Sequence, residues 1–236
     1  MNRRTKKMLR EYYEAPKPEK KREFVARWTR QRISIGKMIL HQLRYISKLH
    51  ILCSTLLFGI MLAAGSYVSF SVLGTLYAMV PFLVVLSVTE SMRSFRFGMT
   101  ELESTTLFSL KSIIMMRMLL LGIGNMFCLF MFAFIRNENV IMEFIYLLVP
   151  YFMTAAGGLA VFRRHSGVTG NYMCLALSAG VSALQCYVYY AYHDIYLAEY
   201  NTIWLFVCIL LAVLLGREMK QTFLVITKQR EDLVWD

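Results

Sequence analysis

The sequence predicts an all-α, polytopic membrane protein with six transmembrane helices, both termini in the cytoplasm, a basic amino-terminal arm and an interfacial amphipathic helix. Hydrophobic residues make up 57% of the 236 residues and gather into long runs. Charged residues make up only 17%, against about 25% in soluble domains. The net charge of +11 comes mostly from residues between those runs. A disordered or fibrous chain and an ordinary soluble globule are thereby excluded.

The first part of the chain divides into a basic arm, residues 1–32, and an amphipathic segment, residues 33–48. Pro16 and Pro18 interrupt the arm, since proline removes a backbone donor and clashes with the preceding turn. In the second segment the apolar residues at helical spacing are Ile35, Ile39, Leu43 and Ile46, opposite Lys37, His41, Arg44 and Lys48. This pattern predicts a helix that lies in the inner membrane interface and leads into the first span. The alternative is a cytoplasmic helix packed on another part of the chain.

Residues 49–216 form the predicted transmembrane domain. A membrane-crossing helix needs about 20 mostly apolar residues, because the hydrocarbon layer is about 30 Å thick. The stretches that meet this need run approximately from Leu49 to Ser69, Ser71 to Thr89, Leu107 to Ile135, Val140 to Phe162, Asn171 to Tyr192 and Thr202 to Gly216. The last is short unless it continues into the predicted cytoplasmic tail, residues 217–236.

The distribution of Lys and Arg predicts the orientation of the chain. Fifteen of these residues precede the first span, four lie between Glu90 and Arg117, two follow the fourth span and four follow Gly216. Only Arg136 falls on the other side, a partition of 25 to 1. The positive-inside rule therefore predicts a multi-pass protein of the cell membrane with cytoplasmic termini. The long basic region also argues against a cleavable signal peptide.

This partition explains the net charge without a nucleic-acid partner. The excess of basic residues faces the cytoplasm, where anionic lipid contributes about 1 kcal/mol of attraction per suitably placed Lys or Arg. We find no zinc-finger spacing and no recognisable RNA-binding motif in the sequence. The predicted partner of the basic surface is therefore the lipid bilayer.

The cytoplasmic segment 90–110, between the second and third spans, differs from a plain connector. Gly98 ends a first short element, and Thr100 is placed to cap a new helix through the N–H of Glu103. Glu101 and Glu103 then lie in the first turn, where the helix dipole favours anions. We expect two short helices here, the second leading into the third span.

This segment resembles one found in the membrane subunits of ABC-2 type exporters. There the second span is followed by E-x-x-R-x-x-G-T-x-E-x-L-x-x-T-P-x-S, then by apolar residues and a basic residue. The residues in comparable positions are Glu90, Arg93, Gly98, Thr100, Glu101, Thr105, Thr106, Ser109 and Arg117. The sequence departs from the pattern at Met99, at Leu107 in place of proline, and at Arg117 in place of lysine. The chain also resembles uncharacterised six-span membrane proteins of Gram-positive bacteria with a basic arm.

The ABC-2 resemblance implies a permease subunit that moves a substrate with a separate nucleotide-binding ATPase subunit. It also implies a homodimer, or a heterodimer with a second permease. The residues then expected to bind the ATPase are Glu90, Arg93, Gly98, Thr100, Glu101, Glu103 and Ser109. Two other hypotheses stay open. One is a membrane-embedded regulator, such as a membrane-tethered transcription-factor inhibitor, and the other is a non-transporting accessory or scaffold subunit.

The sequence predicts no enzyme, and no catalytic, cofactor-binding or metal-binding residues. It has no GxxxxGK[ST] phosphate-binding loop, no HExxH and no GxSxG. Any ATP hydrolysis is therefore assigned to the separate subunit.

Polar and small residues inside the spans are assigned to helix contacts. We expect Asn125 and Gln185 to form hydrogen bonds between helices, and Arg117 to extend toward the inner head groups. The alternative for Asn125 and Gln185 is that they line a substrate path. Pairs of small residues four apart predict close helix packing in the bundle or at a dimer contact. These residues are Ala156, Ala160, Ser178, Ser182, Ala179 and Ala183.

Overall fold

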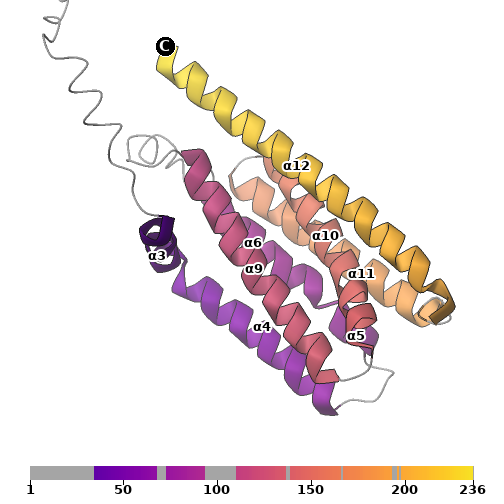
Figure 1. Ribbon diagram of the computed structural model, residues 1–236. Helices are drawn as coiled ribbons and strands as arrows, with labels where there is room; N and C mark the ends of the chain where they lie inside the picture. Colours follow the sequence, from indigo (N-terminus) through magenta and orange to yellow (C-terminus); the bar gives the residue numbers. More distant parts are fainter. Residues whose placement is uncertain are drawn as a thin grey trace, which may run out of the picture. The chain divides into compact units, whose positions relative to one another are not determined.

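The computed structural model describes residues 35–67, 73–93, 110–136, 139–165, 167–192, 196 and 198–235 (Figure 1). Every regular element in these ranges is a helix, which confirms the predicted all-α class. The chain divides into two compact units, Met1–His41 and Gln42–Asp236. The predicted basic arm, residues 1–32, lies outside the described residues.

The predicted amphipathic segment contains the helix α3, Ile35–Tyr45. Ile46 and Ser47 separate it from α4, Lys48–Tyr67, which covers most of the first predicted span. The segment that was expected to lead directly into the first span is thus interrupted by two non-helical residues.

The second predicted span is divided into α5, Leu73–Tyr77, and α6, Val80–Ser91. Pro81 lies in the first turn of α6, where its missing N–H removes no hydrogen bond. The turn before α6 exposes the carbonyl of Ala78, and the hydroxyl of Ser182 donates to it across 2.8 Å. A contact from another helix therefore satisfies the backbone at this break.

Four long helices and one short 3-10 helix follow in the part of the chain that the structure describes. They are α9, Leu110–Arg136; α10, Val140–Arg164; α11, Val168–Ala191; η3, Ala198–Tyr200; and α12, Asn201–Trp235. Pro150 lies inside α10, which continues through it as one helix. The last predicted span ended at Gly216, whereas α12 continues far into the predicted tail.

Five of the described helical segments are long and apolar enough to cross a membrane. They are Gly74–Ser91, Ile113–Ile135, Val140–Arg164, Val168–Ala191 and Asn201–Val225. Lys48–Ala64 is a shorter apolar helix by the same measure. By length and composition, these helices are compatible with a membrane protein.

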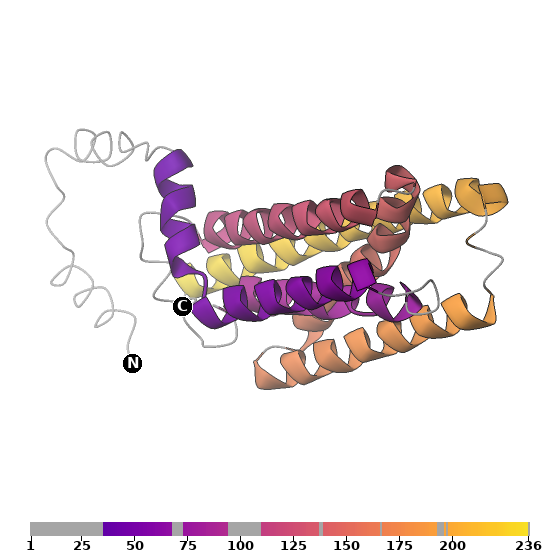
Figure 2. The same ribbon diagram turned by 90° about the horizontal axis from the view of Figure 1, so that it is seen from below.

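Within Gln42–Asp236, α6 lies at the centre of the helices and contacts α4, α9, α10 and α11 (Figure 1). Seen from the second direction, α4, α9 and α12 run lengthwise beside one another (Figure 2). The side chains that fill the core are aliphatic and aromatic, and include Val80, Val84, Leu129, Phe132, Leu147 and Leu159. The central position explains why α6 is mostly buried, whereas α12, which packs chiefly on α10, is mostly exposed.

Candidate functional site

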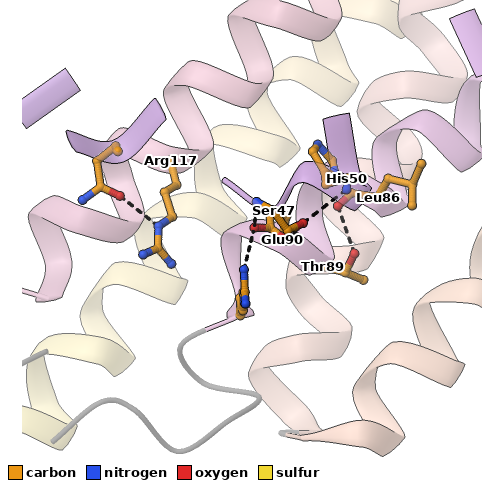
Figure 3. A network of polar contacts seen from close by, with 8 residues as sticks. Ser47, His50, Leu86, Thr89, Glu90 and Arg117 are labelled. Carbon is orange, nitrogen blue, oxygen red and sulfur yellow. Dashed lines mark hydrogen bonds and ion pairs between the residues drawn. The ribbon is translucent and has the colours of Figure 1, made fainter. Parts of the chain in front are cut away.

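The structure describes the predicted ATPase-binding segment only at its two edges. Outside the described residues lie Gly98, Thr100, Glu101, Glu103, Thr105, Thr106 and Ser109. Glu90 and Arg93 precede the undescribed stretch 94–109, and Arg117 follows it. All three take part in polar contacts at one end of the helices (Figure 3).

Glu90, near the end of α6, is hydrogen-bonded to Ser47, the residue that precedes α4. The backbone N–H of Ser47 donates to Oε1 of Glu90 over 2.9 Å, and the Ser47 hydroxyl donates to Oε2 over 3.1 Å (Figure 3). Both bonds are charge-assisted, and both oxygens of one carboxylate are used. Glu90 thereby fixes the start of α4 against the end of α6.

Ser47 is also the amino-terminal cap of α4. Its Oγ accepts a hydrogen bond from the N–H of His50 at 3.2 Å, the usual geometry of a serine cap. The carboxylate of Glu90 therefore lies at a helix amino terminus, where the helix dipole favours an anion. Arg93 forms an ion pair with the same carboxylate at 3.4 Å, with its own side chain 44% exposed.

Arg117, in the second turn of α9, is almost fully buried, with 5% of its surface exposed. Its Nε–H donates to the amide oxygen of Gln42 over 2.9 Å. The guanidinium also lies over the ring of Tyr45, 5.6 Å from the ring centre. The expected extension of Arg117 to the lipid head groups is therefore wrong, because the protein itself provides its polar and aromatic partners.

We call Gln42, Ser47, Glu90 and Arg117 the polar junction. Glu90, which precedes residues 94–109, is hydrogen-bonded to Ser47, and Arg117, which follows them, is hydrogen-bonded to Gln42. The chain on both sides of this stretch therefore contacts the same short segment, residues 42–47. Glu90 and Arg117 were predicted from the sequence as members of a functional segment, whereas their partners Gln42 and Ser47 were not.

A signal for Gln42 was present in the sequence. On a helical wheel of about 100° per residue, Gln42 falls within about 20° of Ile35, on the apolar face of α3. A polar residue on an apolar face predicts a buried polar partner. The pattern alone did not indicate that this partner is Arg117.

Polar residues deeper in the spans form the expected kind of contact. The amide Nδ2 of Asn125 in α9 donates to the hydroxyl oxygen of Ser87 in α6 over 2.8 Å. The amide Nε2 of Gln185 in α11 donates to the hydroxyl oxygen of Tyr196 over 3.1 Å. The first bond joins two spans as predicted, whereas the second joins a span to the connection before α12.

The predicted packing residues fall into three environments. Ser178 and Ser182 of α11 face the bundle, since Ser178 is fully buried and Ser182 bonds to the turn before α6. Ala156 and Ala160 of α10 are partly buried. Exposed in the single chain are Ala179 and Ala183. The predicted dimer contact stays a prediction.

An apolar groove lies between α6, α9, α10 and α12 and has a volume of about 320 Å³. Its walls include Val88, Met115, Leu159 and Met219. The helices α6 and α10 run toward the end of the bundle that holds the polar junction, and α9 runs away from it. The lining residues come from the later parts of α6 and α10 and from the first part of α9, so the groove lies in the half of the bundle nearer the polar junction. A small ligand pocket has a volume of about 300 Å³ or more, so the groove has the size of a binding site.

The described ranges contain no group of three His, Cys, Asp or Glu residues placed to hold a metal ion. Comparison of the chain with protein-family models, with curated proteins and with solved structures gives no match. The polar junction and the apolar groove are therefore interpreted from their own chemistry.

Proposed function

We propose that the chain is the permease subunit of an ABC-2-like transporter, which moves a substrate across the cell membrane together with a separate ATPase subunit. The observation that supports the proposal best is the polar junction. It lies directly beside residues 94–109, whose sequence resembles the ATPase-binding segment of that family. It links these residues to the helices α4, α6 and α9.

The polar junction suits the transmission of force. Residues 94–109 connect α6 to α9, so a partner that pushes on them acts on both helices. Because Glu90 and Arg117 each bond to residues 42–47, the same push reaches the start of α4. Coordinated tilting of packed helices is a recognised way to switch between two states. In this proposal, ATPase closure tilts α4, α6 and α9 together and changes the side from which the substrate has access.

The proposal includes six spans, with α4 as the first. This helix has 20 residues and therefore a length of about 30 Å, which matches the hydrocarbon thickness of a bilayer. The positive-inside partition of 25 to 1 supports cytoplasmic termini.

Cysteine labelling tests this topology in a variant in which all five native cysteines are replaced by alanine. A Ser71→Cys variant places a thiol after α4, and Glu199→Cys places one before α12. A membrane-impermeant thiol reagent should label both from outside intact cells, while Arg164→Cys should react only after permeabilisation. Labelling of Ser71→Cys from the inside alone would show that α4 does not cross the membrane.

Charge reversal tests the ATPase contact. The double variant Glu101→Lys/Glu103→Lys should reach the membrane normally. The ATPase activity that co-purifies with the tagged chain should fall by at least about tenfold, because the charge of the two docking residues is reversed. The matched control is Glu199→Lys, an exposed acid at the opposite end of the helices. Unchanged ATP hydrolysis in the double variant would count against docking at residues 94–109.

Deletion of residues 1–32 separates the permease from the regulator hypothesis. A permease should keep its ATPase without the basic arm, whereas a regulator should lose its cytoplasmic partner. Transport measured with purified ATPase complex in vesicles then separates a permease from a scaffold subunit.

A further inference from the structure

The chemistry of the apolar groove limits what can occupy it. Among its lining residues, Ser87, Ser91 and Tyr151 carry the polar side chains. The hydroxyl of Ser91 donates to the Ser87 carbonyl over 2.8 Å, and the Ser87 hydroxyl accepts from Asn125 over 2.8 Å. Both serine hydroxyls already have partners within the protein, so a polar ligand would lose its water without gaining equivalent bonds from them. The groove therefore favours a hydrocarbon chain.

Two basic residues lie at the same level along the helices as the end of the groove that is nearer the polar junction. Arg217 stands two positions before the lining residue Met219 of α12, and Lys220 stands one position after it. Both basic side chains are exposed.

The neighbouring acids are paired with basic residues. Glu90 forms an ion pair with Arg93 at 3.4 Å, and Glu218 forms one with Arg163 at 2.8 Å. With these two pairs balanced, Arg217 and Lys220 make the local charge positive, which complements an anionic headgroup but not a cationic one.

We propose that the groove binds an acyl chain of an anionic lipid from the cytoplasmic leaflet, with the headgroup at the level of Arg217 and Lys220. This inference rests on the proposed function and names the substrate class of the permease. The lipid enters sideways from the bilayer between the helices, so it needs no water-filled path. Residues 94–109 connect two of the four groove helices, α6 and α9, so ATPase closure changes the shape of the groove.

Two glycines of α9 give a matched pair of variants. Gly122 lines the groove, and a Cβ added there meets only the Tyr151 hydroxyl oxygen, at 3.9 Å. Gly124, two residues further along, is exposed and has nothing within 4 Å of an added Cβ. Gly122→Leu should fill the groove, whereas Gly124→Leu adds the same side chain outside it.

The experiment uses the full chain in vesicles that contain phosphatidylglycerol with a photoreactive diazirine in the middle of one acyl chain. After illumination, mass spectrometry locates the labelled residues. We expect labelling of the groove residues of α9 and α12, a loss of at least about fivefold in Gly122→Leu, and no change in Gly124→Leu. The double variant Arg217→Gln/Lys220→Gln should reduce labelling by about fivefold per charge removed. The same probe with a phosphatidylcholine headgroup should label wild type more weakly.

Equal labelling of wild type and Gly122→Leu would overturn the inference, since it would show lipid that only surrounds the helices. Equal labelling by the two headgroups would overturn the anionic preference. The readout needs no ATPase, so it is separable from the proposed function. Groove labelling in a chain that co-purifies with no ATPase would support the lipid site and contradict the permease proposal. An associated ATPase without groove labelling would support the permease proposal and contradict the lipid site.

Discussion

Ser47 donates both its backbone N–H and its hydroxyl to the carboxylate of Glu90, a residue 43 positions further along the chain. A single serine thus caps α4 and holds the end of α6. The contact links the amino-terminal end of the first apolar helix to the residue where the ABC-2-like segment begins.

The Ser47–Glu90 contact should be measurable as a coupling energy. Ser47→Ala and Glu90→Ala should each lower the free energy of unfolding by about 1.5–3 kcal/mol, because each removes hydrogen bonds to a charged group. The double variant should lose less than the sum of the two, by at least about 1 kcal/mol. Unfolding in mixed micelles titrated with dodecyl sulfate gives these values. Glu199→Ala, an exposed acid, serves as the control and should change the value by less than about 0.5 kcal/mol. Full additivity would contradict the contact.

Arg117 should resist replacement by lysine. Arg117→Met leaves the buried amide of Gln42 without its partner and should lower the free energy of unfolding by about 2 kcal/mol. Arg117→Lys should recover little of this loss, since lysine has no planar group to donate at Nε and lie over Tyr45.

The double variant Gln42→Leu/Arg117→Met should be more stable than Arg117→Met alone, because both polar partners are then replaced by apolar groups. The same unfolding titration measures the three variants. A lysine variant as stable as the wild type would contradict the assigned geometry.

Gly74 and Gly180 should respond to alanine with opposite signs. An added Cβ at Gly74 would lie 2.6 Å from Cγ of Tyr189, so α5 and α11 would have to move apart. Such overpacking should cost about 1–3 kcal/mol. Nothing lies within 4 Å of an added Cβ at Gly180, in the middle of α11. Gly180→Ala should therefore raise stability by about 0.5–1 kcal/mol, through the better helix propensity of alanine. Thermal unfolding in detergent compares the two, and equal effects would contradict the packing of α5 on α11.

Tyr196 should make the protein sensitive to alkali. Burial raises the pKa of Tyr196 above its ordinary value, and the hydrogen bond from Gln185 acts in the opposite direction. In the unfolded chain the Tyr196 hydroxyl loses its proton at about pH 10, while in the folded chain it still holds it. Stability is thus unaffected below about pH 10 and falls as the pH rises toward the folded pKa. The unfolding temperature should drop less steeply above about pH 10 in Tyr196→Phe than in the wild type. Parallel curves would show that Tyr196 ionises normally.

The helices were predictable where their signal is local. α9, α10 and α11 begin and end within a few residues of the predicted spans, because a long apolar run and its polar flanks are visible without knowledge of any neighbour. The break between α5 and α6 was less visible. The Ala78 carbonyl at this break is satisfied by Ser182, a residue 104 positions away.

The candidate site was predictable only in part for the same reason. Glu90 and Arg117 were selected because they flank a motif, but the fate of Arg117 was predicted wrongly. A basic residue near the start of a span usually extends to the head groups. Here Gln42, 75 positions earlier in the chain, lies close enough to accept its hydrogen bond.

The sequence by itself determined that this is an all-helical protein with long apolar helices, because hydropathy and helix length are sums over neighbouring residues. It also yielded the predicted orientation from loop charges. Only the tertiary structure decided that Ser47 pairs with Glu90, that Gln42 pairs with Arg117, and that four helices leave an apolar groove between them. These features depend on how each helix is rotated and placed against the next, and that arrangement follows from the packing of many distant side chains at once.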